Sequence, residues 1–304
     1  MKKIVILILC LAFTLFCGCS STNTNVDNNG NNTDFIVPIL PDLEDTEDKD
    51  QSTEEVPVPE IKPPADIPIV PEVVPPTTPD IGGDNDVFDE EQEEKKKLYI
   101  RSNANALRVR SKNSLSSTVL GTLDKNDMLN YKGTDGSFYV TEFKEQTAYV
   151  YSDMCTLVEM STESDKIENA IDLGAKLLGH PYVWGSQRYH WGNGVLNKNF
   201  KAGEFDCSAL VQYVYYKSCG VILDVTSRAQ SLNGTAVKKA DLKRGDLMFF
   251  TNASRINKTG IERIGHVGIY FGDNYILHTA SDHAVIEPIS SLRWSYYVTA
   301  RRVV

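Results

Sequence analysis

The chain has 304 residues, enough for two modest domains and additional segments, and its formal net charge is −10 at pH 7. Between Asp27 and Glu94 there are 21 acidic residues and two lysines, whereas residues 95–304 carry 27 basic and 20 acidic residues. The acidic pI therefore comes from the segment 27–94, and the later part of the chain is mildly basic. A mildly basic surface suits an anionic partner such as a cell wall, but it is equally compatible with an ordinary mixed surface.

The N-terminus is typical of an export signal. The basic MKK is followed by an apolar run over residues 4–16, which is too short to span a bilayer comfortably. The sequence FCGCS at 16–20 resembles the lipobox of bacterial lipoproteins, with Phe16 in place of the usual leucine. We therefore expect residues 1–19 to be a lipoprotein signal, with an ordinary cleaved signal peptide as the alternative. The resemblance implies a lipid on Cys19, and two acyl chains there would anchor the protein stably to the outer face of the cell membrane.

Residues 20–96 show no apolar periodicity. The segment begins with Asn and Thr, continues with a proline every few residues and ends acidic, and it holds eleven of the thirteen prolines. Such a chain buries too little apolar surface to offset the entropy of ordering, so we expect an extended, disordered spacer. Solubility alone is an equally compatible role. Together with a lipid anchor, the segment is interpreted as a tether.

Residues 97–158 are expected to form a small β domain. Alternating runs at 106–111, 117–131, 137–143 and 147–155 are separated by Ser, Asn, Gly and Asp turns, which is typical of a small barrel or sandwich. The region resembles the bacterial SH3-like domain, which implies cell-wall binding or packing on a neighbouring catalytic domain. The matching positions are Leu107, Val109, Arg110, Ser111, Val119, Gly121, Leu123, Tyr139, Val140, Tyr149 and Val150.

An amphipathic helix is predicted at the start of the last domain, residues 162–304. Thr162 and Ser164 are candidate N-caps, and Gly179 with Pro181 ends the helical pattern. We interpret this helix as part of the core rather than the site. Its apolar positions recur at the i, i+3, i+4 and i+7 spacing of one helix face: Ile167, Ala170, Ile171, Gly174, Leu177 and Leu178.

A second helix is predicted to begin at Cys207, with Asp206 as its cap and Gly220 at its end. A thiol in the first turn meets unsatisfied backbone N–H groups and the positive end of the helix dipole, which lower its pKa. A lone buried cysteine is more often a small core residue, so the position alone leaves both roles open. With Cys155 and Cys219, an odd number of cysteines follows the signal, and at least one is expected to be free.

Two histidines flank a hairpin signal, Gly-Asp-Asn at 272–274. If Gly268 pairs opposite His278, then His266 and His278 are diagonal neighbours on one sheet face. A thiolate nucleophile needs a base and an orienting group, and this pair can supply both; two satisfied core histidines are the alternative. The chain has no HExxH or CxxC spacing, no phosphate loop and no nucleic-acid motif. We therefore expect no metal, no cofactor and no nucleic-acid partner.

The last domain closely resembles the NlpC-type papain-like cysteine peptidases of bacterial cell walls. Five segments match that family in order: HPYVWG (180–185), FDCSALVQYVYYKSCGV (205–221), TSRAQ (226–230), LKRGDLMFF (242–250) and GHVGIYFGDNYILHTA (265–280). The resemblance implies an α+β fold in which an antiparallel sheet packs on helices and the nucleophile begins a helix. The small all-β SH3-like barrel precedes it.

The resemblance implies hydrolysis of peptidoglycan stem peptides, commonly at a γ-D-glutamyl bond to a diamino acid. By position, Cys207 is the nucleophile, His266 is the base, and His278 holds His266 in the productive tautomer. We expect a monomeric cysteine endopeptidase of the cell surface. A non-catalytic wall-binding lipoprotein is one alternative, and an amidase or acyltransferase on the same fold is another.

The resemblance also implies substrate contacts. Backbone N–H groups at the helix start, with Tyr182 nearby, would stabilise the tetrahedral oxyanion. Asp206, Ser208 and Ser227 are implied to bind the substrate peptide. We add Arg228, which could bind a stem-peptide carboxylate with two hydrogen bonds or could be an ordinary surface arginine. Residues 186–205 are longer than the family's usual connection, and we expect them to border the cleft and to influence specificity.

Overall fold

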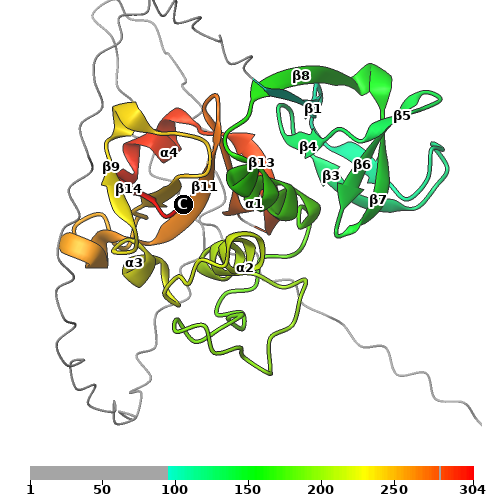
Figure 1. Ribbon diagram of the computed structural model, residues 1–304. Coiled ribbons are helices and arrows are strands. Elements are labelled where there is room, and N and C mark those ends of the chain that lie inside the picture. Colours follow the sequence, from blue (N-terminus) through cyan, green and yellow to red (C-terminus); the bar gives the residue numbers. More distant parts are fainter. Residues whose placement is uncertain (1–94, 281) are drawn as a thin grey trace, which may run out of the picture. The chain divides into compact units, whose positions relative to one another are not determined.

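The computed structural model describes residues 95–304 with the exception of residue 281 (Figure 1). The predicted signal peptide and lipobox, residues 1–19, lie outside the described residues. So does the predicted tether, residues 20–96, apart from its last two positions. Among the helices of the described residues, none is both long and apolar enough to cross a membrane.

The β region contains two antiparallel sheets, one ordered β4-β1-β8 and the other β3-β2-β7-β6-β5. Its elements are β1 (Lys96–Ser102), β2 (Leu107–Arg110), β3 (Val119–Leu123), β4 (Met128–Asn130), β5 (Gly133–Asp135), β6 (Phe138–Phe143), β7 (Gln146–Tyr151), the 3-10 turn η1 (Ser152–Met154) and β8 (Cys155–Ser161). The first and last strands pair along their whole lengths, from Lys96 opposite Ser161 to Ser102 opposite Cys155. The first and last strands of the β region therefore lie side by side in one sheet.

The alternating run 117–131 contains two strands rather than one. It divides into β3 and β4, which belong to different sheets. Asn126 between them has a left-handed φ of 74°, and the Asp127 carboxylate accepts a hydrogen bond from Asp124 N at 2.7 Å. This tight turn redirects the chain, because a residue at positive φ ends an extended run.

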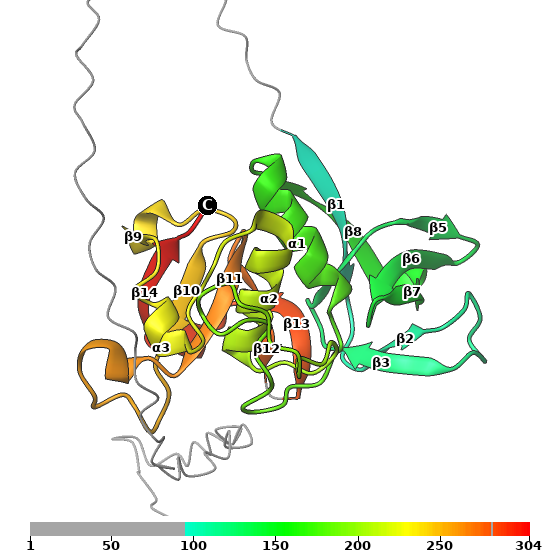
Figure 2. The same ribbon diagram turned by 60° about the horizontal axis from the view of Figure 1, so that its bottom comes forward.

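The C-terminal domain is a six-stranded antiparallel sheet with the order β13-β12-β11-β10-β14-β9. Figures 1 and 2 show α1 and α2 together on one side of this sheet. The elements are α1 (Asp165–Lys176), α2 (Cys207–Cys219), α3 (Ser227–Gln230), β9 (Thr235–Val237), η2 (Lys239–Asp241), β10 (Leu247–Phe250), η3 (Gly260–Arg263), β11 (His266–Gly272), β12 (Tyr275–Ala280), β13 (His283–Pro288), α4 (Ser291–Ser295) and β14 (Tyr297–Arg302).

Helix α1 buries the predicted face, including Ile167, Ala170 and Ile171. Ser164 is its N-cap, although its side chain makes no capping hydrogen bond. Its C-terminal end is capped by the turn between β6 and β7, where Lys144 N donates to Leu178 O at 2.9 Å and Glu145 N donates to Lys176 O at 2.8 Å. The β region thus satisfies carbonyls that a helix end leaves unpaired.

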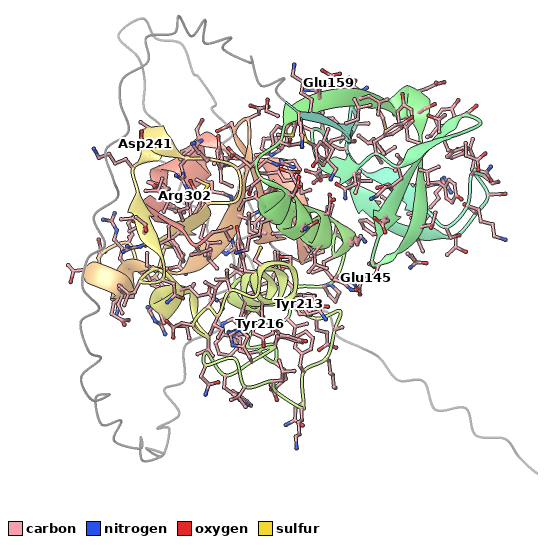
Figure 3. All side chains as sticks on the ribbon, viewed as in Figure 1. Glu145, Glu159, Tyr213, Tyr216, Asp241 and Arg302 are labelled. Carbon is pink, nitrogen blue, oxygen red and sulfur yellow. The ribbon has the colours of Figure 1, made fainter. Side chains whose placement is uncertain are left out.

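Helix α2 is buried more widely than the predicted stripe, since every residue from Cys207 to Tyr215 is buried. The connection 186–205 folds over the helix and covers it with aromatic side chains. The ring of Tyr189 lies 5.2 Å from that of Tyr213 and 5.5 Å from that of Tyr216. Figure 3 shows Tyr213 and Tyr216 on the side of this connection. Asp206 and Gly220 cap the helix as predicted, with Gly220 at a φ of 67°.

The β11–β12 hairpin has the predicted register. Ile269 lies opposite Leu277 and Tyr270 opposite Ile276, which is the alignment expected if Gly268 faces His278. The turn residues Asp273 and Asn274 have φ values of 47° and 66°, as a tight hairpin turn requires. A Cβ on Gly268 would lie 2.9 Å from the Cβ of His278, so this glycine provides the space for the imidazole.

Candidate active site

Cys207 is 8% exposed and begins α2. Its sulfur accepts hydrogen bonds from the backbone N–H groups of Val267 and Ser208. Burial, and next the Asp206 carboxylate, raise the pKa of the Cys207 thiol to about 12. The predicted lowering of this pKa is therefore wrong, because the cost of desolvating a thiolate exceeds the stabilisation by the helix start.

His266 and His278 form a hydrogen-bonded pair. Nε2 of His266 lies 2.8 Å from Nδ1 of His278. Burial lowers the pKa of His266 well below its usual value, and the neighbouring His278 and Arg293 lower it further. Burial, followed by Arg293, lowers the pKa of His278 to about 4. Both imidazoles are consequently neutral at neutral pH.

The nucleophile candidate and the histidine pair meet at the start of β11. The Val267 N–H that contacts the Cys207 sulfur follows directly after His266 in the chain. A neutral thiol beside a neutral imidazole is suited to general-base catalysis, in which the thiol proton leaves as the sulfur attacks. The arrangement does not require an ion pair that exists before substrate binds.

Tyr182 is brought to this place by backbone pairing. It forms an isolated bridge with Phe205, two residues before Cys207, and its N–H donates to Asp282 O at 2.7 Å. The Tyr182 side chain is half-buried. The structure therefore places this sequence-predicted residue beside the segment that leads into α2.

Asp206 and Ser208 are buried in a network centred on Arg188, which the sequence analysis missed. Nη2 of Arg188 lies 2.9 Å from Asp206 Oδ2 and 3.1 Å from Ser208 Oγ. The remaining Asp206 oxygen accepts from Ala209 N at 2.8 Å and from Ser208 Oγ at 3.0 Å. Arg188 lies in the irregular connection 186–205, so no periodicity in the sequence could have indicated it.

Ser227 and Arg228 lie on the short helix α3, which Thr226 caps. Gln230 at its end donates through Nε2 to Ser208 O at 3.0 Å, so α3 is joined to the first turn of α2. Arg228 Nε is 3.9 Å from Glu262 Oε1, and its side chain is 33% exposed. At this exposure and distance the ion pair is weak.

The histidine pair continues into two residues that the sequence analysis did not select. His278 Nε2 is 2.9 Å from Glu287 Oε1 on β13, and Arg293 Nη2 on α4 is 3.1 Å from the same oxygen. Glu287 could have been selected from the sequence by extending the predicted hairpin to the next strand. There, Glu287 opposes Ile276 and shares a sheet face with His278.

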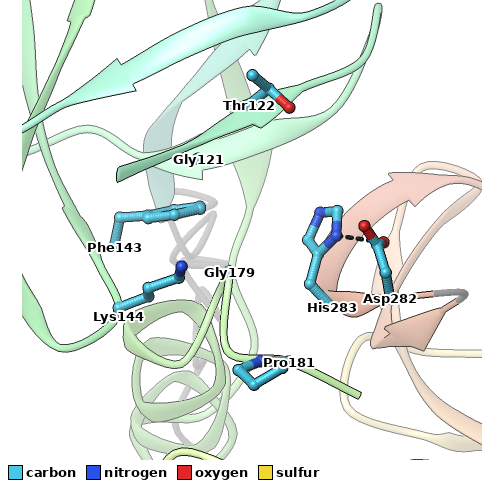
Figure 4. A pocket seen from close by; sticks show the side chains of 8 residues that line it. All are labelled: Gly121, Thr122, Phe143, Lys144, Gly179, Pro181, Asp282 and His283. Atoms are coloured by element: carbon cyan, nitrogen blue, oxygen red, sulfur yellow. Dashed lines mark hydrogen bonds and ion pairs between the residues drawn. The ribbon is translucent and has the colours of Figure 1, made fainter. Parts of the chain in front are cut away.

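A pocket lies between the β region and the C-terminal domain (Figure 4). One side carries Phe143 and Lys144, and the other carries His283, whose Nδ1 is 2.5 Å from Asp282 Oδ1. The Asp282 carbonyl also binds the Tyr182 N–H. The β region therefore lines a hollow next to the backbone that positions Tyr182. The full lining is Gly121, Thr122, Phe143, Lys144, Gly179, Pro181, Asp282 and His283.

The three cysteines of the described residues, Cys155, Cys207 and Cys219, are all free thiols. Cys155 is half-buried, and burial raises its pKa to about 12. Within the part of the chain that the structure describes, no group of three or more His, Cys, Asp and Glu side chains is arranged to hold a metal ion.

Two family models match the chain, the NlpC/P60 family over residues 179–303 and the bacterial SH3 domain over residues 105–154. The Murein DD-endopeptidase MepS/Murein LD-carboxypeptidase of Escherichia coli strain K12 is 30% identical over 162 residues, which are 52% of this chain and 78% of that protein. The chain belongs to the NlpC/P60 family. Its relatives include peptidoglycan endopeptidases, and its fold is an α+β papain-like domain preceded by an all-β SH3-like region, as predicted.

Other NlpC/P60 relatives match a smaller share of their own length. The Peptidoglycan DL-endopeptidase CwlO of Bacillus licheniformis is 33% identical over 150 residues, 48% of this chain and 30% of that protein. The Gamma-D-glutamyl-L-lysine dipeptidyl-peptidase of Bacillus cereus is 33% identical over 138 residues, 44% of this chain and 36% of that protein. The chain thus spans about a third of the length of these two relatives.

Proposed function

We propose that this protein is a cell-wall hydrolase that cleaves peptide bonds in peptidoglycan stem peptides through Cys207. The observation that carries the proposal is the meeting of the buried Cys207 sulfur with the first residues of β11, where His266 hydrogen-bonds His278. The names of the NlpC/P60 relatives support peptidoglycan as the substrate class.

In the proposed reaction, the Cys207 sulfur attacks the scissile carbonyl carbon while its proton passes to His266. Backbone N–H groups at the start of α2, with Tyr182 nearby, stabilise the oxyanion of the tetrahedral intermediate. His266 then returns the proton to the leaving amine, and a thioester remains on Cys207. A water molecule, deprotonated by His266, hydrolyses the thioester and restores the thiol.

We propose the γ-D-glutamyl bond to a diamino acid as the scissile bond. The names of the Bacillus cereus dipeptidyl-peptidase and of the DL-endopeptidase support this bond, whereas the name of the Escherichia coli relative points to other stem-peptide bonds. Mass spectrometry of the muropeptides released from purified peptidoglycan separates these outcomes, because each bond leaves a different terminal residue on the product.

Substrate contacts are proposed for Tyr182, Asp206, Ser208, Ser227 and Arg228. Since Asp206 and Ser208 are buried and both bind Arg188, we propose that they shape the wall beside the nucleophile. Arg228 is partly exposed and weakly paired, so its guanidinium is available to a stem-peptide carboxylate. Arg228→Ala is expected to raise KM several-fold and to leave kcat nearly unchanged.

The decisive experiment compares the full-length protein with Cys207→Ala on insoluble peptidoglycan. The wild-type protein is expected to release new amino groups, and Cys207→Ala is expected to release none above background. Cys219→Ala serves as the matched control, because Cys219 is also a free cysteine of α2 but lies at the opposite end. Unchanged release by Cys207→Ala would contradict the cysteine mechanism, and wall binding without turnover by the wild type would favour a binding protein.

We further propose that Cys19 carries a lipid and that residues 20–96 tether the domains to the outer face of the cell membrane. Membership of a cell-wall hydrolase family supports a location in the cell envelope. The sequence around Cys19 supports the anchor. Cys19→Ser is expected to move the protein from the detergent phase to the aqueous phase in a detergent partition assay; a wild-type protein already in the aqueous phase would contradict the anchor.

A further inference from the structure

We propose that Glu287 is a positioning residue that sets the tautomers of both histidines and so directs a free lone pair of His266 at the Cys207 thiol. The inference rests on the proposed function, because it explains how that site would be prepared for proton transfer. It extends the site beyond the histidine pair to β13 and α4.

The residues lie in a continuous row on consecutive elements. His266 is on β11, His278 on β12, Glu287 on β13, and Arg293 on the helix α4 that follows. The successive contacts are 2.8 Å from His266 Nε2 to His278 Nδ1, 2.9 Å from His278 Nε2 to Glu287 Oε1, and 3.1 Å from Arg293 Nη2 to Glu287 Oε1. His278 has no exposed surface, and within the described part of the chain its ring nitrogens hydrogen-bond His266 and Glu287.

The donor and the acceptor of each hydrogen bond in this row follow from the charged groups at its Glu287–Arg293 end. An ionised carboxylate only accepts, and a guanidinium only donates. Burial acts to raise the pKa of Glu287, but the hydrogen bond to His278 and the charge of Arg293 together outweigh it and lower this pKa to about 2, so Glu287 is ionised. His278 must therefore carry its proton on Nε2, and its Nδ1 then accepts from Nε2–H of His266. His266 Nδ1 is left without a proton, in the form that a general base requires.

A carboxylate is needed because the histidine pair alone does not choose a direction. With both protons moved to the other nitrogens, His278 Nδ1 would donate to His266 Nε2, and His266 Nδ1 would carry a proton and be unable to accept one from Cys207. Glu287 excludes that arrangement, since it would leave a carboxylate facing an unprotonated nitrogen. Arg293 keeps Glu287 ionised and also opposes protonation of both imidazoles.

The test uses Glu287→Gln in the full-length protein, because glutamine keeps the shape but can accept or donate. Nitrogen-15 NMR of the imidazoles is expected to show Nε2–H on both histidines in the wild type and a mixture of tautomers in Glu287→Gln. The kcat on muropeptides is expected to fall about 10-fold to 100-fold with KM nearly unchanged, because a wrong tautomer removes the base without removing binding. Glu159→Gln, at an exposed residue of β8, is the matched control.

The acid limb of the rate profile gives a second readout. His278 is faced by Glu287 and His283 of β13 and by Arg293 of α4, and Glu287 in turn raises the pKa of Asp127, before β4. Arg293→Gln leaves the carboxylate but removes the cation that opposes imidazole protonation. The acid limb of kcat is therefore expected to move to higher pH. This variant decides the question if Glu287→Gln does not fold.

The outcomes are distinguishable. Unchanged tautomers and a kcat within twofold of the wild type in Glu287→Gln would overturn the inference, as would an unmoved acid limb in Arg293→Gln. If the wild type releases no muropeptide, the proposed function fails. The NMR measurement needs no substrate and still decides whether Glu287 sets the tautomers.

Discussion

Cys207 and the proposed base, His266, are both uncharged at neutral pH, because burial raises the pKa of the thiol and lowers that of the imidazole. Burial disfavours the thiolate and the imidazolium alike, so the pKa of Cys207 rises while the pKa of His266 falls. The position of Cys207 at a helix start, which favours thiolate in a sequence argument, is outweighed by desolvation. Proton transfer is therefore expected during attack rather than before it.

This charge state predicts the pH dependence of kcat/KM. His266 acts as a base only when neutral, and its pKa lies below 6.5, so activity is expected to be lost only as pH falls below 6.5. The thiol pKa of about 12 predicts no rise between pH 8 and 9. A profile from pH 4 to 10 checks both limbs, and a rise near pH 8.5 would indicate a thiolate mechanism instead.

Asp127 gives a prediction on stability, because burial raises the pKa of its carboxyl to about 7. The unfolded carboxyl titrates near 3.8, so the stability present below that pH is lost as pH rises through 7. Asp127→Asn removes this loss and keeps an oxygen for Asp124 N. The free energy of unfolding is expected to rise by about 1–3 kcal/mol at pH 8 and by less at pH 5.

Denaturant titrations at the two pH values measure this difference. Asp135→Asn is the control, because Asp135 is exposed in β5. Equal effects of Asp127→Asn at pH 5 and pH 8 would contradict a buried, protonated carboxyl.

At the scale of elements, the β11–β12 hairpin could be predicted because turn residues and alternation are local signals. The turn residues Gly272-Asp273-Asn274 predicted how β11 and β12 align, and the structure shows this turn and this alignment. The sequence did not show that the run 117–131 divides between two sheets, because only long-range pairing decides where the chain leaves one sheet for the other. The burial of α2 was underestimated because the irregular connection 186–205 covers it.

Gly268 tests how closely the two hairpin strands must approach. A Cβ at Gly268 would lie 2.6 Å from Ile276 Cδ1 and 2.9 Å from His278 Cβ, so Gly268→Ala forces β12 and its histidine to move. Activity is expected to fall at least about 10-fold, since small displacements of catalytic groups are costly. The overpacking costs about 1–3 kcal/mol of stability.

Gly220→Ala separates the two effects. Gly220 has a φ of 67°, and a Cβ added there would meet no atom within 4 Å, so alanine strains the backbone without touching the site. It is expected to cost about 1 kcal/mol and to preserve kcat/KM. Equal losses of activity in the two variants would show that the Gly268 effect is only a loss of stability.

At the scale of the whole molecule, Arg244 joins the β region to the catalytic domain. Its side chain is 4% exposed, and its Nε lies 2.7 Å from Glu168 Oε1 of α1. It also donates to Tyr99 Oη of β1 and to Phe271 O of β11. Together with the β6–β7 turn that caps α1, this contact makes the SH3-like region part of the support of the catalytic domain.

Arg244→Met is expected to destabilise the protein by about 3 kcal/mol, because it leaves the mostly buried Glu168 carboxylate, whose side chain is 14% exposed, without its cation. Calorimetry is expected to show separate transitions for the two regions where the wild type shows one. Lys96→Met is the control, since Lys96 and Glu159 are exposed and 3.9 Å apart. A single unchanged transition in Arg244→Met would show that the regions are independent of this contact.

The local features of the chain were accessible from the sequence alone. Helix caps at Asp206 and Gly220 and the hairpin turn depend on neighbouring residues and could be predicted, whereas the α+β fold and the SH3-like region were predicted from the resemblance to known families. The tertiary structure alone decided the charge state of Cys207, the engagement of Asp206 by Arg188 and the extension of the histidine row to Glu287. These properties depend on burial and on contacts between segments that are distant in the chain, and neither can be predicted from the local sequence.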